Sequence, residues 1–172
     1  KEGDIKMISY EENTNKFNFR VGGIIESPDK NKILIHRLSN FDFWLLPGGR
    51  VEMLEDTKKA ILREIEEELG IKVDKDNLKL VQIAENFFDY LDNGKVKNVH
   101  ELSYIYNIVL DDSYDITKKE SFTELEKPHV TFVWKTKEEI LKEDFKLVPN
   151  IVKNVIGKKE LHYDIIDDRK YI

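Results

Sequence analysis

The 172-residue chain has no cysteine, no long apolar run and no excess of positive charge. Without cysteine it can form no disulfide, zinc–thiolate site, iron–sulfur cluster or cysteine nucleophile. No apolar run approaches the roughly 20 residues of a membrane-spanning helix, and the first residues lack the apolar core of a secretion signal. The 28 basic and 34 acidic residues give a net charge of −6, which argues against coating nucleic acid or a membrane surface. We therefore expect a cytoplasmic protein with no nucleic-acid or membrane partner.

The composition and length favour one globular domain. Hydrophobic residues make up 40% of the chain and charged residues 36%, so a core can form beneath a strongly ionic surface. No internal repeat, low-complexity tract or Pro/Gly/Ser-rich linker divides the sequence. We predict a poorly ordered, polar lead-in over residues 1–15 and a single domain over 16–156. Residues 157–172 are expected to form a C-terminal extension packed on the domain or following it.

Strand-forming residues appear on both sides of clear turn signals. Two β-rich runs flank Ser27-Pro28-Asp29-Lys30-Asn31, which predicts a hairpin over 17–37. Two longer runs, 78–90 and 96–110, flank Asn93-Gly94, a strong hairpin signal. Residues 111–128 are predicted to form an acidic loop, followed by a strand at 130–135.

Helix signals are clearest in the middle of the chain. Residues 57–69 have an apolar face, with Asp56 as the expected N-cap and Gly70 as the left-handed residue after the helix. Thr136 and Glu139 predict a capping box at the start of a later helix. Strands before and after one strong helix indicate an α/β (α+β) sandwich, in which helices flank a mixed β-sheet.

Three carboxylates share one narrow face of the 57–69 helix. At about 100° per residue, Glu67 lies about 60° to one side of Glu64 and Glu68 about 40° to the other. The apolar stripe lies beside this face, so burying the stripe brings the carboxylates to the rim of the core. Partly buried like charges repel by roughly 3 kcal/mol at 6 Å, and a hard divalent cation removes that cost. Most isolated acidic runs are simply solvated, so the surrounding pattern decides between the two interpretations.

That pattern resembles the Nudix box over residues 49–71. The box is a glycine, five residues, Glu, seven residues, Arg-Glu, an apolar residue, any residue, Glu-Glu, any residue, Gly and an apolar residue. Every specified place is filled, by Gly49, Glu55, Arg63, Glu64, Ile65, Glu67, Glu68, Gly70 and Ile71. Chance agreement is on the order of 10⁻⁸ per starting position. Leu54 departs from the common pattern, because many members have Gly before the first box glutamate, and this places the loop conformation in question.

The resemblance covers about residues 16–156 and implies a metal-dependent hydrolase on a Nudix-like fold. Nudix enzymes cleave the pyrophosphate linkage of a nucleoside diphosphate joined to another moiety, using Mg²⁺ or Mn²⁺. By motif position, the expected metal ligands are Glu64, Glu67, Glu68 and the carbonyl of Gly48. Arg63 would hold the carboxylates through a bidentate pair, and Glu55 would anchor the start of the helix. Glu85-Asn86-Phe87-Phe88 and His100-Glu101 resemble a bacterial subgroup of unassigned substrate.

The sequence offers several candidates for the general base and for the residues that contact substrate. The base is either a box glutamate or a carboxylate from elsewhere, and Glu101 and the acidic loop are the outside candidates. Arg20 and Arg37 are candidate phosphate contacts, and Phe87 and Phe88 are candidates for stacking on a nucleobase. The expected substrate is a small nucleotide derivative, such as a nucleoside triphosphate or a nucleotide sugar. The alternative is a non-catalytic nucleotide- or metabolite-binding regulatory module on the same fold, and a homodimer is possible.

Overall fold

One mixed β-sheet organises the molecule. The computed structural model describes residues 7–124 and 127–171. The strands are β1 (Ser9–Glu12), β2 (Asn15–Glu26), β3 (Lys32–Leu38), β4 (Trp44–Leu45), β5 (Gly48–Arg50), β6 (Lys79–Asp92), β7 (Lys95–Val109), β8 (Ser121–Glu124), β9 (Lys127–Thr136), β10 (Leu147–Val148) and β11 (His162–Asp167). The helices are α1 (Thr57–Leu69) and α2 (Lys137–Leu141), with 3₁₀ turns η1 (Lys75–Asn77), η2 (Asp115–Lys118) and η3 (Asn150–Val155).

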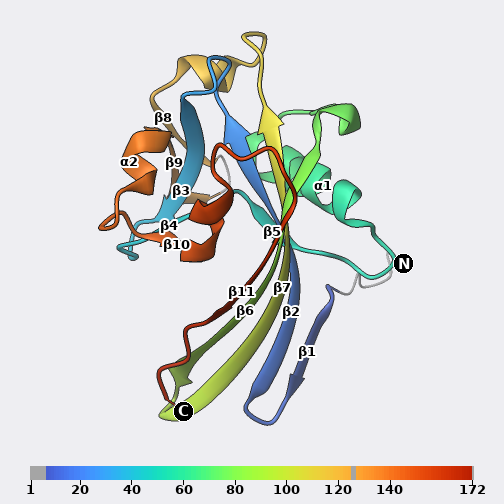
Figure 1. Ribbon diagram of the computed structural model, residues 1–172, viewed down its shortest axis with the longest axis vertical. Helices are drawn as coiled ribbons and strands as arrows, with labels where there is room; N and C mark the ends of the chain where they lie inside the picture. Colours follow the sequence, from blue (N-terminus) through green and yellow to red (C-terminus); the bar gives the residue numbers. More distant parts are fainter. Residues whose placement is uncertain (1–6, 125–126, 172) are drawn as a thin grey trace.

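The main strand order is β10-β4-β3-β2-β7-β6-β11, with β1 and β5 pairing along β2, and β9 joining β3 to β8. The β2–β7 and β6–β11 pairs are parallel, whereas β6–β7 is antiparallel, so the sheet is mixed. In Figure 1, α1 and α2 lie on opposite sides of the upper part, and the long strands β2, β6 and β7 extend well below them. The predicted fold class, a mixed sheet flanked by helices, is confirmed.

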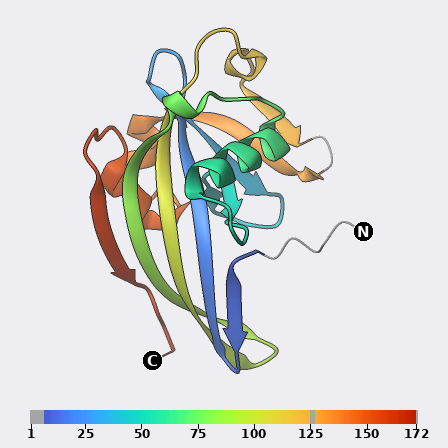
Figure 2. The same cartoon turned by 90° about the vertical axis from the view of Figure 1, so that its right-hand side faces the viewer.

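Each side of the sheet has its own hydrophobic cluster, because successive strand residues point to opposite faces. We call the two sides the α1 face and the η3 face, after the helices that cover them. Buried residues of the α1 face include Val21, Ile25, Leu34, Ile61, Ile65 and Ile108. Buried residues of the η3 face include Ile24, Ile35, Ile105, Ile140, Val152 and Val155. The turned view in Figure 2 shows α1 lying across the upper strands.

The second predicted hairpin is confirmed, and the first is only partly right. The turn residues Asn93 and Gly94 both have positive φ, and β6 and β7 pair antiparallel on either side of them. In the first segment both strands form, but β2 pairs with β3 only at Glu26 and Ile33. Along its whole length β2 pairs with β7, and β3 pairs with β9. The turn at 27–31 follows from its local sequence, whereas packing between distant segments decides which strands pair with β2 and β3.

Both ends of the chain contribute strands. The lead-in was expected to be poorly ordered, but β1 pairs antiparallel with the start of β2, and residues 1–6 lie outside the described residues. Within 157–172, β11 pairs parallel with β6 and so extends the sheet. The predicted acidic loop over 111–128 contains η2 and β8. Backbone pairing between distant segments, which composition does not reveal, accounts for the strands β1 and β11 at the two ends.

Candidate active site on α1 and the β2–β5 strands

Helix α1 forms over the predicted residues because both of its ends are specified locally. The Asp56 side chain accepts a hydrogen bond from the Lys59 backbone N–H at 2.9 Å, which caps the first turn. Gly70 has a φ of 67° and its N–H donates to the Glu66 carbonyl, which ends the helix. The apolar stripe of α1 packs on the sheet, so the acidic face lies at the edge of the core.

Arg63 is the centre of the acidic cluster. Its Nε and Nη2 donate to the two oxygens of Glu55 at 2.8 and 2.9 Å, a bidentate pair. Its Nη1 donates to Glu64 at 2.9 Å and to Glu67 at 3.5 Å, and Nη2 also donates to the Arg50 carbonyl at 3.1 Å. The guanidinium lowers the pKa of Glu55, chiefly through the hydrogen bonds. Arg63 therefore ties the loop before α1, strand β5 and the helix acids together.

Glu64 lies directly against strand β5. A Cβ on Gly49 would lie 2.2 Å from Glu64 Oε1, so only glycine leaves room for this carboxylate. The side chain of Glu64 is buried, and burial raises its pKa despite the opposing hydrogen bond from Arg63. The two glycines that precede the box acids therefore allow close approach of backbone and carboxylate.

Glu68 is the least satisfied of the box acids. Its Oε2 is buried and has no hydrogen-bond partner. Burial, and then the charge of Glu64, raise the pKa of Glu68 to about 8, while the backbone N–H of Gly48 acts in the opposite direction. This carboxylate thus has an oxygen that a cation or a proton would satisfy.

The donor set suits a hard divalent cation, although no cage is already closed around one point. Glu67 is exposed and its carboxylate turns to Arg63. Across residues 7–124 and 127–171, no three His, Asp or Glu side chains are arranged as a ready-made metal site. Carboxylate oxygens are nevertheless the ligands that Mg²⁺ prefers, and the unpartnered oxygen of Glu68 beside Glu64 is compatible with such an ion.

Glu101 lies on the η3 face, not beside the box acids on α1. Its β-sheet neighbours in register are Asn18 on β2 and Asn86 on β6. Burial raises the pKa of Glu101, while Arg20, Asn18 and Ser103 act to lower it. The Arg20 Nε lies 3.9 Å from Glu101 Oε2. The positive charge of Arg20 also opposes the raised pKa of Glu64, so this arginine acts on both acidic groups.

The other residues predicted to contact substrate lie in different parts of the structure. The guanidinium of Arg37 packs 4.7 Å from the centre of the Trp44 ring. Phe87 stacks on His100 at 4.3 Å on the side of the sheet opposite Glu101. Phe88 pairs with Val99, in the row next to Glu101, and strand alternation places it on the η3 face. Among these candidates, the structure brings Arg20 and Phe88 into the neighbourhood of Glu101.

No site role was predicted from the sequence for three polar residues of this neighbourhood. Asn18, Asn86 and Ser103 are all buried, and the Asn86 Oδ1 has no hydrogen-bond partner. The available signal was that polar residues occupy alternate positions in otherwise apolar strands. Strand register was needed to show that they meet, because Asn18 on β2 is far in the sequence from Asn86 and Ser103 on the β6–β7 hairpin.

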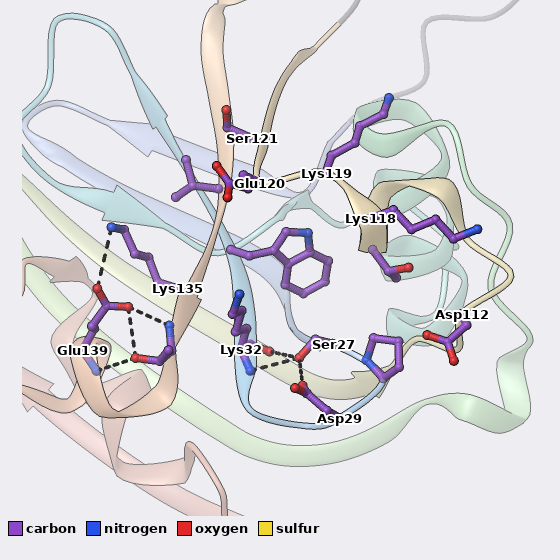
Figure 3. Close-up of a pocket in the computed structure, with 15 residues that line it drawn as sticks. Ser27, Asp29, Lys32, Asp112, Lys118, Lys119, Glu120, Ser121, Lys135 and Glu139 are labelled. Atoms are coloured by element: carbon purple, nitrogen blue, oxygen red, sulfur yellow. Dashed lines mark hydrogen bonds and ion pairs between the residues drawn. The ribbon is translucent and has the colours of Figure 1, made fainter.

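A broad hollow of about 740 Å³ lies elsewhere on the surface. It is lined by segments near Ser27, around η2 and along β9, and none of the box residues lines it. Figure 3 shows its mixed charge, with Lys32, Lys135 and Glu139 on one side and Lys118 and Lys119 extending outward on another. The balanced charges of this hollow do not favour a phosphate-rich ligand, so the α1 acids remain the candidate site.

Comparisons with known proteins agree on the fold. The NUDIX domain family model matches residues 16–153. A MutT protein structure from Bacillus halodurans is 21% identical with a TM-score of 0.61, over 88% of this chain and 91% of that one. A NUDIX hydrolase structure from Nitrosomonas europaea is 20% identical with a TM-score of 0.53, over 94% of this chain and 82% of that one.

A curated relative matches a shorter segment. An 8-oxo-dGTP diphosphatase of Proteus vulgaris is 45% identical over 47 residues, which is 27% of this chain and 41% of that protein. The matched segment therefore spans about two fifths of the relative's length. No helix among the described residues is both long and apolar enough to cross a membrane. Because the family model covers most of the sequence and the box is complete within it, the chain belongs to the NUDIX domain family.

Proposed function

We propose that the protein is a metal-dependent pyrophosphohydrolase that cleaves the diphosphate linkage of a small nucleotide derivative. The observation that carries this proposal is the buried, unpartnered oxygen of Glu68 beside Glu64 on the acidic face of α1. Such a pair of carboxylates is costly unless a cation is shared between them. Family membership supports the same chemistry, since the complete box lies within the matched region.

Each box residue would have a specific role in metal binding or catalysis. Glu64, Glu67, Glu68 and the Gly48 carbonyl would hold Mg²⁺, with Mn²⁺ as the other candidate. A bound divalent cation supplies charge neutralisation for the diphosphate and lowers the pKa of water at the site. Arg63, fixed by Glu55, keeps the carboxylates in place, and a box carboxylate would take the proton of the attacking water. Water attacks one phosphorus, and the other phosphate leaves with the bridging oxygen.

A nucleoside triphosphate is the substrate class that has the most support. The relative from Proteus vulgaris is named as an 8-oxo-dGTP diphosphatase, and its 45% identity is confined to 47 residues. This similarity supports a nucleotide with an anhydride bond without selecting the base. The side chain of Arg20 is 39% exposed and its charge acts on Glu64, so it is a candidate contact for one of the phosphates.

The proposal is tested by replacing the box acids one at a time. Glu67→Gln and Glu68→Gln keep side-chain size but remove a charged oxygen donor. Each should lower the turnover number by at least about 100-fold without loss of folding, because the bound cation and the water depend on these groups. The measurement is release of phosphate or pyrophosphate from a panel of nucleotides, including 8-oxo-dGTP, in Mg²⁺ and after chelation.

Glu66→Gln is the matched control, since Glu66 belongs to the same acidic run but is exposed and pairs with Lys72 at 3.7 Å. This control should retain the wild-type rate. If Glu67→Gln and Glu68→Gln also retained it on a substrate that the wild type hydrolyses, the proposal would be wrong. Tight nucleotide binding without hydrolysis in saturating Mg²⁺ would instead favour the regulatory module.

A further inference from the structure

The sheet ends in a strand whose outer side is unpaired. β11 is the last strand of the main order and, among the described strands, it pairs only with β6. Figure 2 shows β11 in dark red at the outer margin of the sheet. An edge strand of this kind presents backbone N–H and C=O groups with which another extended chain can pair.

The hydrogen bonds to β6 show which backbone groups of β11 point outward. In a parallel ladder, every second residue of a strand bonds to the same neighbouring strand. The Asp168 N–H, just beyond the end of β11, donates to the Phe87 carbonyl on β6 at 2.7 Å. The even-numbered residues of β11 therefore direct their backbone groups to β6, whereas Tyr163 and Ile165 direct theirs to the free edge.

The same part of the chain has apolar side chains that the fold leaves uncovered. Tyr163 and Ile165 are 61 and 60% exposed, and Leu161, immediately before β11, is 56% exposed. Strand alternation places Tyr163 and Ile165 on the α1 face, because Asp167 of the same alternation pairs with Phe87. Helix α1 covers the upper strands and not this edge (Figure 2). Exposed apolar residues on an unpaired edge indicate an interaction surface.

A second copy of the same strand fits this edge in an antiparallel register. About a twofold axis through Tyr163, each Leu161 lies opposite Ile165 of the other copy. On the other face of the sheet, each His162 lies opposite Asp164 of the other copy, so an imidazole N–H donor meets a carboxylate. Apolar residues thus meet apolar residues, and the charged acceptor meets a donor.

The neighbouring registers match less well. An axis through Asp164 places the two copies of this carboxylate opposite each other, and an axis through Ile166 places Asp164 opposite Asp168. An axis through Ile165 avoids both clashes but places Tyr163 opposite an aspartate. Like charges directly opposite each other destabilise a strand pair, whereas aromatic and β-branched pairs stabilise it. The side chains therefore select the register about Tyr163.

We propose that two copies of this chain associate by antiparallel pairing of β11 with β11 about Tyr163, which joins the two sheets into one. The pairing satisfies the outward backbone groups of Tyr163 and Ile165 and covers their side chains. One pair of short strands buries less area than a standard interface, so the dissociation constant should be micromolar. β1 also pairs with only one described strand, but it has four residues and two of them are glutamates. This inference does not depend on the proposed function.

The test measures the mass of the full chain by sedimentation velocity over a range of concentrations. The wild type should show a monomer–dimer equilibrium. Tyr163→Lys and Tyr163→Glu each place like charges on the twofold axis, so each variant alone should raise the dissociation constant by at least about tenfold. An equimolar mixture of the two should restore association as a heterodimer, because lysine then lies opposite glutamate. Both variants lose the hydrogen bond that Tyr163 donates to Glu85, so this loss cannot explain a recovery in the mixture.

Tyr10→Lys is the matched control, because Tyr10 is 58% exposed on β1, and it should leave the dimer intact. Ile165→Pro is a second variant: it removes an outward N–H without removing a bond to β6, and it should weaken association by at least about tenfold. Circular dichroism checks that each variant is folded. A monomeric wild type, a dimer that Tyr163→Lys leaves unchanged, or a mixture of the two charged variants that stays monomeric would each overturn the proposal. Loss of the dimer in Tyr10→Lys alone would assign the interface to β1 and would also overturn it.

Discussion

Leu54 has an unusual conformation for its residue type. Its φ is 66°, in the left-handed region, and its side chain is 98% exposed. The sequence comparison with the Nudix box shows that Leu54 replaces a residue that is glycine in many similar proteins. The physical reason is now visible: the loop before α1 turns through a conformation that costs a residue with a Cβ about 1–2 kcal/mol.

Replacing Leu54 with glycine should therefore stabilise the protein. The relief of backbone strain exceeds the added chain entropy of glycine, so we expect a gain of about 0.5–1 kcal/mol in the free energy of unfolding. Thermal and urea unfolding measure this gain. Met53→Gly is the control, since Met53 is also exposed but lacks a positive φ, and it should be neutral or destabilising. Equal destabilisation by both substitutions would contradict the explanation.

At the scale of elements, the site depends on how closely α1 approaches β5. The contact consists of the Glu64 carboxylate on the backbone of Gly49, with Arg63 reaching back to the Arg50 carbonyl. The helix thus positions its acids by packing on glycine as well as by its own periodicity. Adding a side-chain atom on β5 should therefore displace the carboxylate of Glu64.

Gly49→Ala should lower kcat by at least about tenfold, because its Cβ would lie 2.2 Å from Glu64 Oε1 and the carboxylate must move. The measurement is kcat together with the melting temperature. Gly70→Ala, at the far end of α1, is the matched control: its φ of 67° makes alanine unfavourable, but no atom lies within 4 Å of the new Cβ. We expect the control to lose stability and keep kcat. Comparable kcat for Gly49→Ala and the wild type would contradict this account.

At the scale of the whole molecule, a buried histidine links stability to pH. His36 on β3 packs 5.1 Å from Phe132, and its Nδ1 is buried without a hydrogen-bond partner. Burial, followed by the charges of Arg20 and Lys127, lowers the pKa of His36 from 6.5 to about 4. The unfolded chain therefore binds this proton more readily than the folded protein does. The contribution of His36 is fully favourable above pH 6.5 and is lost as the pH falls toward 4.

We expect this single group to cost roughly 2–3 kcal/mol of stability between pH 7 and pH 4.5. Urea unfolding of the wild type and of His36→Phe at both pH values measures the difference. The phenylalanine keeps an aromatic ring beside Phe132 but cannot be protonated, so its stability should fall less on acidification. The same loss in both proteins would show that carboxylates alone account for the pH dependence.

The sequence by itself determined helix α1, its two caps, the Asn93-Gly94 hairpin and the placing of three glutamates on one helical face. These features depend on residues within about one or two turns of each other, so local periodicity and backbone preference are enough. The complete box also made the family recognisable.

Only the tertiary structure decided which strands pair and which distant residues meet. The partner of β2 is β7 rather than β3 along most of its length, and this choice brings Asn18, Glu101 and Asn86 into one row. The same register places Glu101 on the face opposite α1 and lets β1 and β11 join the sheet. Strand pairing depends on packing between segments far apart in the chain, and shifting a strand by one residue would reverse every face.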